Sequence, residues 1–294
     1  MANIEQSTPE HPQGVKPSAE QPNTAQPNVA QPNTAQSQPH PMLRVVQSGP
    51  VLTITLDSPE RRNAQAPSLW TALAEVGGGL DPSVRVVIIR AEGPSFSAGL
   101  DRAMLTPQGA PGEPSILSLA AGAAGLLEDA IEQFQRGFSI WSQVPAITIA
   151  AVQGHAIGAG FQLALACDLR VVADDVAFAM RETSLGLVPD LAGTAPLVRS
   201  VGYARALEIC ATGRFVGAQE AVAIGLAVVA VPGEQLDATA GDLADAILAA
   251  PQAAVRELKP LLRSAVDAGP ADQLRAERAA QARLLTAMVA GPGK

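Results

Sequence analysis

From residue 42 onward, short apolar runs alternate with segments of helical periodicity. The two β-branched runs at residues 43–47 and 51–56 flank the turn sequence Ser-Gly-Pro, which predicts a β-hairpin. Further buried strands are predicted at residues 84–90, 146–152, 169–173, 176–180 and 227–231. Helical patterns cover residues 66–76, 115–141, 158–166, 216–224, 236–248, 253–266 and 271–289. The alternation predicts a mixed α/β fold.

Residues 1–41 have a different composition. They hold eight prolines and three copies of a Gln-Pro-Asn-x-Ala repeat, starting at Gln21, Gln26 and Gln31. Regularly spaced proline removes backbone donors and disfavours helix, and there is little apolar surface to bury. We therefore expect residues 1–41 to form a disordered tail.

Composition excludes several classes of function. The net charge of -8 has the wrong sign for a phosphate-binding surface, and six Phe, two Trp and one Tyr are too few for base stacking. The three histidines, at positions 11, 40 and 155, form no metal-binding pattern with the two cysteines, at positions 167 and 210. The N-terminus lacks a signal-peptide pattern, and no apolar stretch approaches the roughly 18 residues of a membrane span. We expect a soluble, cytoplasmic protein that binds neither nucleic acid nor metal.

Two glycine-bearing turns follow predicted buried strands, at residues 95–101 and 154–162. Glycine lets backbone N–H groups approach a ligand without hindrance from side chains. One donor from each turn could hold an oxygen on which negative charge develops. Gly93-Pro-Ser95-Phe-Ser97 is close to the nucleophile elbow of a serine hydrolase, but the closing glycine is missing and His155 is the only histidine in the predicted folded region.

Four collinear segments resemble the crotonase, or enoyl-CoA hydratase/isomerase, family. They are FSAGLD at residues 96–101, GHAIGAGFQLALACD at 154–168, FAMRE at 178–182 and LGLVPDLAGT at 185–194. The resemblance extends over roughly residues 43–290. It implies a spiral of ββα units forming two stacked sheets, with an acyl-CoA-binding core at residues 42–230. It also implies a helical C-terminal region, residues 231–294, used to form homotrimers or hexamers.

The resemblance also assigns roles to individual residues. The backbone N–H groups of Leu100 and Ala159 correspond to the pair that stabilises a thioester enolate. Such chemistry needs no metal or redox cofactor, since CoA is part of the substrate. The positions that correspond to CoA contacts are Arg61, Arg62, Ala64, Ala98 and Asp101.

The acidic positions bear on the reaction. Family hydratases carry two glutamates, and the corresponding residues here are Gln162 and Glu182. A neutral amide can hold a water but cannot exchange its proton, whereas one carboxylate suffices to move a double bond along an acyl chain. We therefore expect isomerisation through Glu182 rather than hydration, with burial raising the pKa of Glu182. Asp190 matches an acid found in dienoyl-CoA isomerases, although an Asp after Pro is also an ordinary turn residue.

Two alternatives remain open. One is an acyl-CoA-binding protein without proton chemistry, and the other is a different thioester reaction, decarboxylation or hydrolysis, that uses Asp190. Asp168 is interpreted as a structural anchor, and His155 as a residue that packs near the acyl pocket. The Pro- and Gly-rich residues 106–115 are expected to form a mobile loop that covers this pocket.

Overall fold

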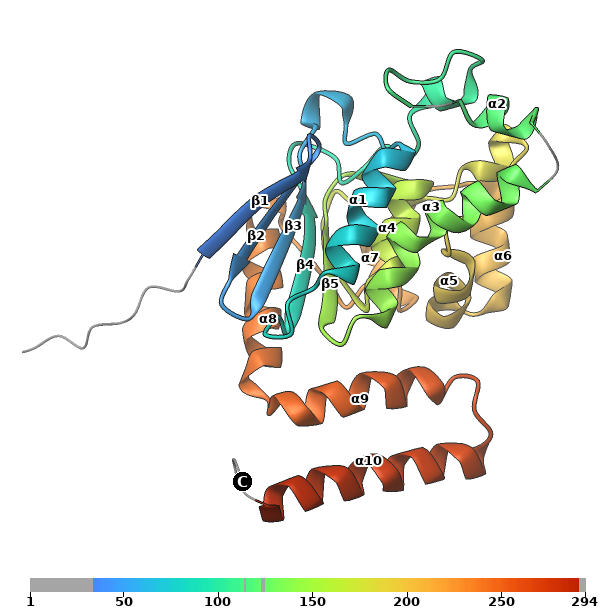
Figure 1. Ribbon diagram of the computed structural model, residues 1–294. Coiled ribbons are helices and arrows are strands. Elements are labelled where there is room, and N and C mark those ends of the chain that lie inside the picture. Colours follow the sequence, from blue (N-terminus) through green and yellow to red (C-terminus); the bar gives the residue numbers. More distant parts are fainter. Residues whose placement is uncertain (1–33, 114, 123–124, 291–294) are drawn as a thin grey trace, which may run out of the picture. The chain divides into compact units, whose positions relative to one another are not determined.

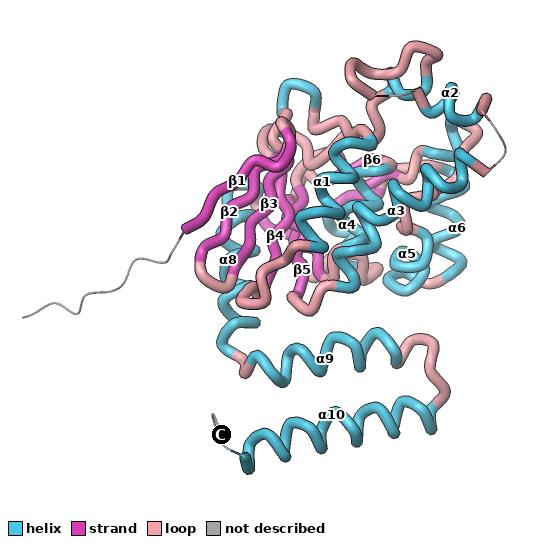
Figure 2. Tube along the Cα trace, in the orientation of Figure 1, coloured by secondary structure: helices cyan, strands magenta, loops and turns pink. Residues whose placement is uncertain are grey.

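The computed structural model describes residues 34–113, 115–122 and 125–290, all of which belong to one compact unit, Pro32–Lys294. The described strands form two sheets (Figures 1 and 2). The larger has the order β1 (Thr34–His40), β2 (Leu43–Ser48), β3 (Val51–Leu56), β4 (Val86–Ala91), β5 (Ile147–Val152), β7 (Leu169–Ala173) and β10 (Val229–Val231). The smaller has the order β6 (His155–Ile157), β8 (Ala177–Ala179) and β9 (Val216–Gly217).

Helices pack around these sheets and extend beyond them. The long helices of the described chain are α1 (Pro67–Gly78), α3 (Leu126–Gln143), α4 (Ala159–Ala166), α5 (Thr194–Val201), α6 (Tyr203–Thr212), α8 (Leu236–Ala249), α9 (Gln252–Ser264) and α10 (Pro270–Ala290). Shorter helical segments are α2 (Ile116–Ala120), α7 (Ala218–Ala223), η1 (Pro59–Arg61), η2 (Arg102–Leu105), η3 (Glu182–Leu185) and η4 (Gly233–Gln235). Among the described residues, no helix is long and apolar enough to cross a membrane.

The hairpin at the start of the fold is confirmed, since β2 and β3 pair antiparallel from Leu43↔Leu56 to Ser48↔Val51. From β3 onward the larger sheet is parallel, through β4, β5, β7 and β10. The strands at its centre are buried on both faces, which explains their uninterrupted apolar sequences. Parallel strands end at one edge of a sheet, and the loops that leave β4 and β5 at this edge contain the two predicted glycine turns.

The expected end of the disordered tail, at residue 41, needs correction. Residues Thr34–His40 form strand β1, which pairs antiparallel with β2 at the edge of the larger sheet. The pairing register shifts between Ser37 and His40, around a proline that cannot donate to the ladder. Exposed polar residues are compatible with an edge strand because the partner strand supplies backbone hydrogen bonds whatever the side chains are. The pentapeptide repeat lies outside the described residues except for its last two positions, Thr34 and Ala35, which begin β1.

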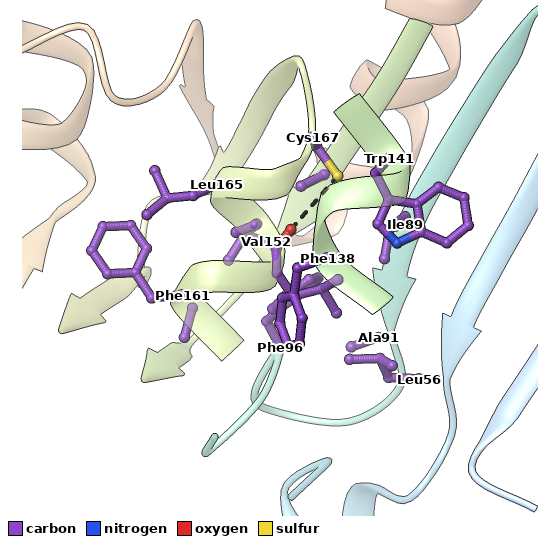
Figure 3. Close-up of a cluster of buried hydrophobic side chains, with 14 of the residues drawn as sticks. Leu56, Ile89, Ala91, Phe96, Phe138, Trp141, Val152, Phe161, Leu165 and Cys167 are labelled. Carbon is purple, nitrogen blue, oxygen red and sulfur yellow. Dashed lines mark hydrogen bonds between the residues drawn. The ribbon is translucent and has the colours of Figure 1, made fainter. Parts of the chain in front are cut away.

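Two apolar layers cover the larger sheet. On one face, α1, α3 and α4, whose residues 159–165 are all buried, pack with the aromatic residues Phe96, Phe138 and Trp141 (Figure 3). The Cys167 thiol is directed at the backbone oxygen of Leu163, 3.8 Å away, and burial raises its pKa to about 12. A helix that is buried on all sides needs no polar face. The sequence of α4 therefore lacks the alternation of apolar and polar positions that marks a surface helix.

On the other face lies α8, whose Leu236, Ala240 and Ala244 contact the undersides of β4, β5 and β7. This helix falls within the predicted C-terminal region, residues 231–294, yet it completes the packing of the sheet. The helices α9 and α10 follow as an antiparallel pair (Figure 1). The predicted continuous helix at residues 115–141 is instead divided into α2 and α3, with Gly125 at positive φ between them.

Candidate active site

The two glycine turns lie against each other. The Ser97 N–H donates to the His155 carbonyl at 2.9 Å, and the Ile157 N–H donates to the Ser97 carbonyl at 3.0 Å. Gly99, at φ +85°, makes the approach possible, because a Cβ there would lie 2.4 Å from the Ile157 oxygen and 3.4 Å from the Ala159 nitrogen. The first turn therefore reaches the start of α4 only because residue 99 has no side chain.

Leu100 and Ala159 supply backbone N–H groups on either side of this contact. Among the described residues, none accepts a hydrogen bond from either N–H, although the backbone groups around both are paired. Ala159 is the first residue of α4, so its N–H is one of the donors that a helix leaves unpaired at its N-terminus. The structure thus places the two predicted oxyanion donors at adjoining turns, where both are free to bind a ligand oxygen.

Glu182 lies beside the second turn, at the start of η3. Its carboxylate packs on Gly158, where a Cβ would be 3.2 Å from Oε1. Oε1 accepts a hydrogen bond of 2.7 Å from Gln162 Nε2, whereas Oε2 is buried and has no partner among the described residues. Burial is the largest influence on this carboxyl and raises the pKa of Glu182, while Gln162 and backbone N–H groups partly oppose the rise.

Gln162 is fully buried on α4 and contacts two segments at once. Its Nε2 donates to Glu182, while its Oε1 accepts from the Leu191 N–H at 2.8 Å and from the Gly193 N–H at 3.3 Å. The sequence suggested that this amide could hold a water. In the structure, backbone donors occupy its oxygen, and one N–H of its nitrogen is directed at the glutamate.

Asp190 sits in the same loop and is half-buried. Its backbone carbonyl accepts from Gln135 Nε2 of α3 at 2.7 Å, which ties the loop to that helix. Burial raises the pKa of Asp190, and its charge contributes to the raised pKa of Glu182. The structure therefore brings a second carboxyl into the electrostatic surroundings of Glu182.

The residues predicted to contact CoA gather at the first turn. The exposed Arg61 forms an ion pair with Asp101, and the Asp101 carboxylate also accepts from the Ala103 N–H at 3.0 Å. The Ala98 N–H donates to the backbone carbonyl of Arg62 at 2.8 Å, and the Ala64 N–H donates to the backbone carbonyl of Arg61 at 3.2 Å. The side chain of Arg62 is exposed, with its backbone at φ +52°. Arg62 therefore lies at the surface beside the turn, and no described acidic side chain pairs with it.

Other polar groups near the turns are structural. The Ser97 hydroxyl donates to the Asn63 carbonyl at 2.7 Å and accepts from Gln65 Nε2 and the Gly99 N–H, so it holds the first turn together. Ser95, which stands at the nucleophile position of the elbow-like sequence, is buried, with 3% of its surface exposed. His155 is exposed, with its ring edge-on to Phe215 at 6.0 Å. Among the described residues, no group of three His, Cys, Asp or Glu side chains is placed to hold a metal ion.

Three residues of the site were not singled out in the sequence. Gln135 fixes the Asp190 loop, Leu191 donates to Gln162, and Gly193 leaves room for the Gln162 side chain, since a Cβ there would be 2.6 Å from Gln162 Cγ. The glycine after Leu-Ala in LGLVPDLAGT was the available signal, because an isolated glycine before a helix often marks a close approach. The role of Gln135, 55 residues before its partner, has no local signal.

Comparison with known proteins identifies the family of this chain. The sequence signature of the enoyl-CoA hydratase/isomerase family matches residues 47–290. A Thermus thermophilus protein provisionally named enoyl-CoA hydratase is 34% identical over 233 residues, covering 78% of this chain and 87% of the relative. A carnitinyl-CoA dehydratase of Escherichia coli is 35% identical over 226 residues, covering 76% and 80%.

Among solved structures, a Thermobifida fusca protein provisionally named enoyl-CoA hydratase, in complex with acetoacetyl-CoA, superposes with a TM-score of 0.80 at 45% identity. The match covers 84% of this chain and 96% of that one. The fold of this chain is that of the crotonase class. This chain belongs to that class, the enoyl-CoA hydratase/isomerase family.

Proposed function

We propose that this protein is an enzyme that shifts the double bond of unsaturated acyl-CoA thioesters through an enolate. The observation that carries the proposal is the buried Oε2 of Glu182, which has no hydrogen-bond partner in the described part of the chain and lies beside the turn that presents the Ala159 N–H. Two free N–H donors suit the thioester oxygen as its negative charge develops, a contribution of roughly 3 to 4 kcal/mol per donor. A carboxylate next to them suits the removal of a neighbouring carbon-bound proton.

The proposed reaction uses Glu182 twice. Its carboxylate takes a proton from one carbon of the acyl chain, and the electron pair of the broken C–H bond delocalises onto the thioester oxygen held by Leu100 and Ala159. The same oxygen of Glu182 then returns the proton to a carbon two atoms away. The double bond has moved, and no water, metal or redox group is consumed. We therefore propose that CoA enters only as part of the substrate.

Isomerisation is preferred to hydration because of Gln162. Hydration requires a second group that exchanges protons with water, and a carboxamide cannot do this at neutral pH. The hydrogen bonds of Gln162 to Glu182, Leu191 and Gly193 use its oxygen and one of its two N–H groups. These contacts support a single-base reaction.

We further propose that Arg61 and Arg62 hold the CoA phosphates. Their exposure and their position beside the first turn support this role, and a guanidinium matches phosphate geometry. We also propose a homotrimer or hexamer, which the exposed Leu258, Leu262 and Leu285 of α9 and α10 support. A cytoplasmic location is proposed from the two unpaired cysteines, Cys167 and Cys210.

The proposal is tested by incubating the purified protein separately with a 3-enoyl-CoA and a 2-enoyl-CoA in heavy water. Interconversion of the two, with deuterium entering the acyl chain and no hydroxyacyl product, is the expected result. Hydroxyacyl product as the main outcome would assign the protein as a hydratase despite Gln162. Tight binding of both thioesters without exchange would instead identify a non-catalytic acyl-CoA binder. Loss of CO₂ or release of free CoA from other thioesters would identify decarboxylation or hydrolysis.

A further inference from the structure

The hydrogen bonds of Gln162 fix the orientation of its amide. Two backbone N–H groups, from Leu191 and Gly193, converge on one side-chain atom, which must therefore be the oxygen. The nitrogen is then the atom that lies 2.7 Å from Glu182 Oε1. Because the amide nitrogen only donates, Oε1 of Glu182 can only accept at this contact.

From this geometry we propose that Gln162 is a positioning residue that confines the exchangeable proton of Glu182 to a single oxygen, Oε2. The inference rests on the proposed function of Glu182 as the base. A proton on Oε1 would face the amide N–H and break the contact, whereas a proton on Oε2 leaves it intact. Oε2 is also the oxygen without a partner among the described residues, so no hydrogen bond has to break for it to take a proton. Gln162 thus takes no part in proton transfer but determines where it happens.

The surroundings of the pair favour this role. Gly193 and Gly158 provide the space, since a side chain at the first would strike Gln162 and one at the second would crowd the Glu182 carboxylate. The absence of side chains at both glycines lets the Gln162 amide and the Glu182 carboxylate meet at 2.7 Å. A side chain held at both ends has little rotational freedom, which is the requirement for a precisely aimed base.

The charged groups near Glu182 make the amide preferable to an acid. Asp190 and Cys210 both interact electrostatically with Glu182, and Arg181 is its chain neighbour. Asp190 and Cys210 are negative when ionised. A further carboxylate at position 162 would therefore raise the free-energy cost of ionising Glu182. A neutral donor stabilises the ionised base without adding to the negative charge.

The test follows α-deuterium exchange of a bound acyl-CoA as a function of pH in three variants. Gln162→Leu removes the donor, and Gln162→Glu keeps an acceptor for Leu191 and Gly193 but places a carboxyl against Glu182. Gln135→Leu is the matched control, because it frees the same loop at the Asp190 carbonyl without touching Glu182. Circular dichroism and the Kd for the thioester show whether each variant is folded.

In Gln162→Leu we expect the maximal exchange rate to fall roughly 10- to 100-fold, the equivalent of one charged hydrogen bond. The pH midpoint should move upward in both Gln162 variants, with the thioester Kd nearly unchanged, and stay in place in Gln135→Leu. If neither Gln162 variant moves the midpoint, or if Gln135→Leu moves it equally, the positioning role is wrong. Absence of exchange in the wild type would overturn the proposed function itself, which separates the two failures.

Discussion

Two carboxylates inside this molecule, Asp168 and Glu182, lie in contrasting surroundings. Asp168 Oδ2 accepts from the Thr148 N–H at 2.8 Å and the Thr148 hydroxyl at 2.9 Å, and it pairs with Lys259 Nζ at 2.7 Å. Glu182 has a neutral amide on one oxygen and no partner among the described residues on the other. The first carboxylate is compensated by a cation, whereas the second is not.

Because their surroundings differ, Asp168 is expected to stabilise the fold and Glu182 to serve the reaction. Lys259 also donates to the backbone carbonyls of Ala146 and Trp141, so the Asp168 cluster fastens α9 to the loop before β5 and the end of α3. Burial lowers the pKa of Lys259, and Asp168 opposes this effect. Glu182 has no such compensation, and an uncompensated buried carboxyl is what a base with a raised pKa requires. The fold is therefore expected to depend on Asp168 and turnover on Glu182.

The largest effect is expected from Glu182→Gln, which keeps the shape of the side chain and the acceptor for Gln162 but removes the base. Proton exchange on a bound acyl-CoA should fall about 10²- to 10⁴-fold, the usual contribution of a general base. Thioester binding, measured by calorimetry, should stay within a few-fold of the wild type. Exchange at the wild-type rate would mean that another group is the base.

The next largest effect is expected from Lys259→Met. It leaves Asp168 without its cation, and breaking one half of a buried ion pair costs about 3–5 kcal/mol. Denaturant unfolding should show the loss. Adding Asp168→Asn to Lys259→Met should recover part of it, since the uncompensated charge is then gone. If the single variant is as stable as the wild type, the cluster does not fasten α9.

The sequence predicted the local parts of both regions. Alternation and apolar runs located the hairpin, the central strands and the helix after the second turn, and the family motifs located Leu100, Ala159 and Glu182. The role of Asp168 as an anchor could be interpreted from its place at the end of ACD, but its partner lies 91 residues later on α9. Sequence periodicity does not encode which distant side chain meets a buried charge.

The parts that could not be predicted depend on tertiary contacts. Strand β1 forms from exposed polar residues because an edge of the sheet was available to pair with, not because of its own propensity. Similarly, Gln162 is recognisable as a departure from the hydratase pattern. Its contacts with Leu191 and Gly193 only become visible when the loop after η3 folds back over α4.

Glu182→Gln should also stabilise the fold above the ordinary pKa of the carboxyl. This effect is smaller than the loss of turnover. The pKa of Glu182 in the folded protein is raised above its ordinary value of 4.5, so the folded state binds more protons than the unfolded state between 4.5 and the raised value. The contribution of Glu182 to stability is therefore present at low pH and is lost as the pH rises through this window. The variant should have a higher Tm than the wild type at pH 8, and the gap should close as the pH falls to about 4.5. If wild type and variant have the same Tm at pH 8 as well as at about pH 4.5, burial does not destabilise the ionised form of Glu182.

The smallest effect is expected from Asp190→Asn. The Asp190 charge is a minor contributor to the raised pKa of Glu182, and its backbone carbonyl, which anchors the loop to Gln135, is unchanged by the substitution. Turnover should change by less than about fivefold, the equivalent of about 1 kcal/mol, and the pH midpoint of exchange should move slightly downward because a neighbouring negative charge is removed. Loss of activity as large as that in Glu182→Gln would contradict this. It would make Asp190 a second acid in the reaction, and the site would then hold a pair of proton-transfer groups rather than one.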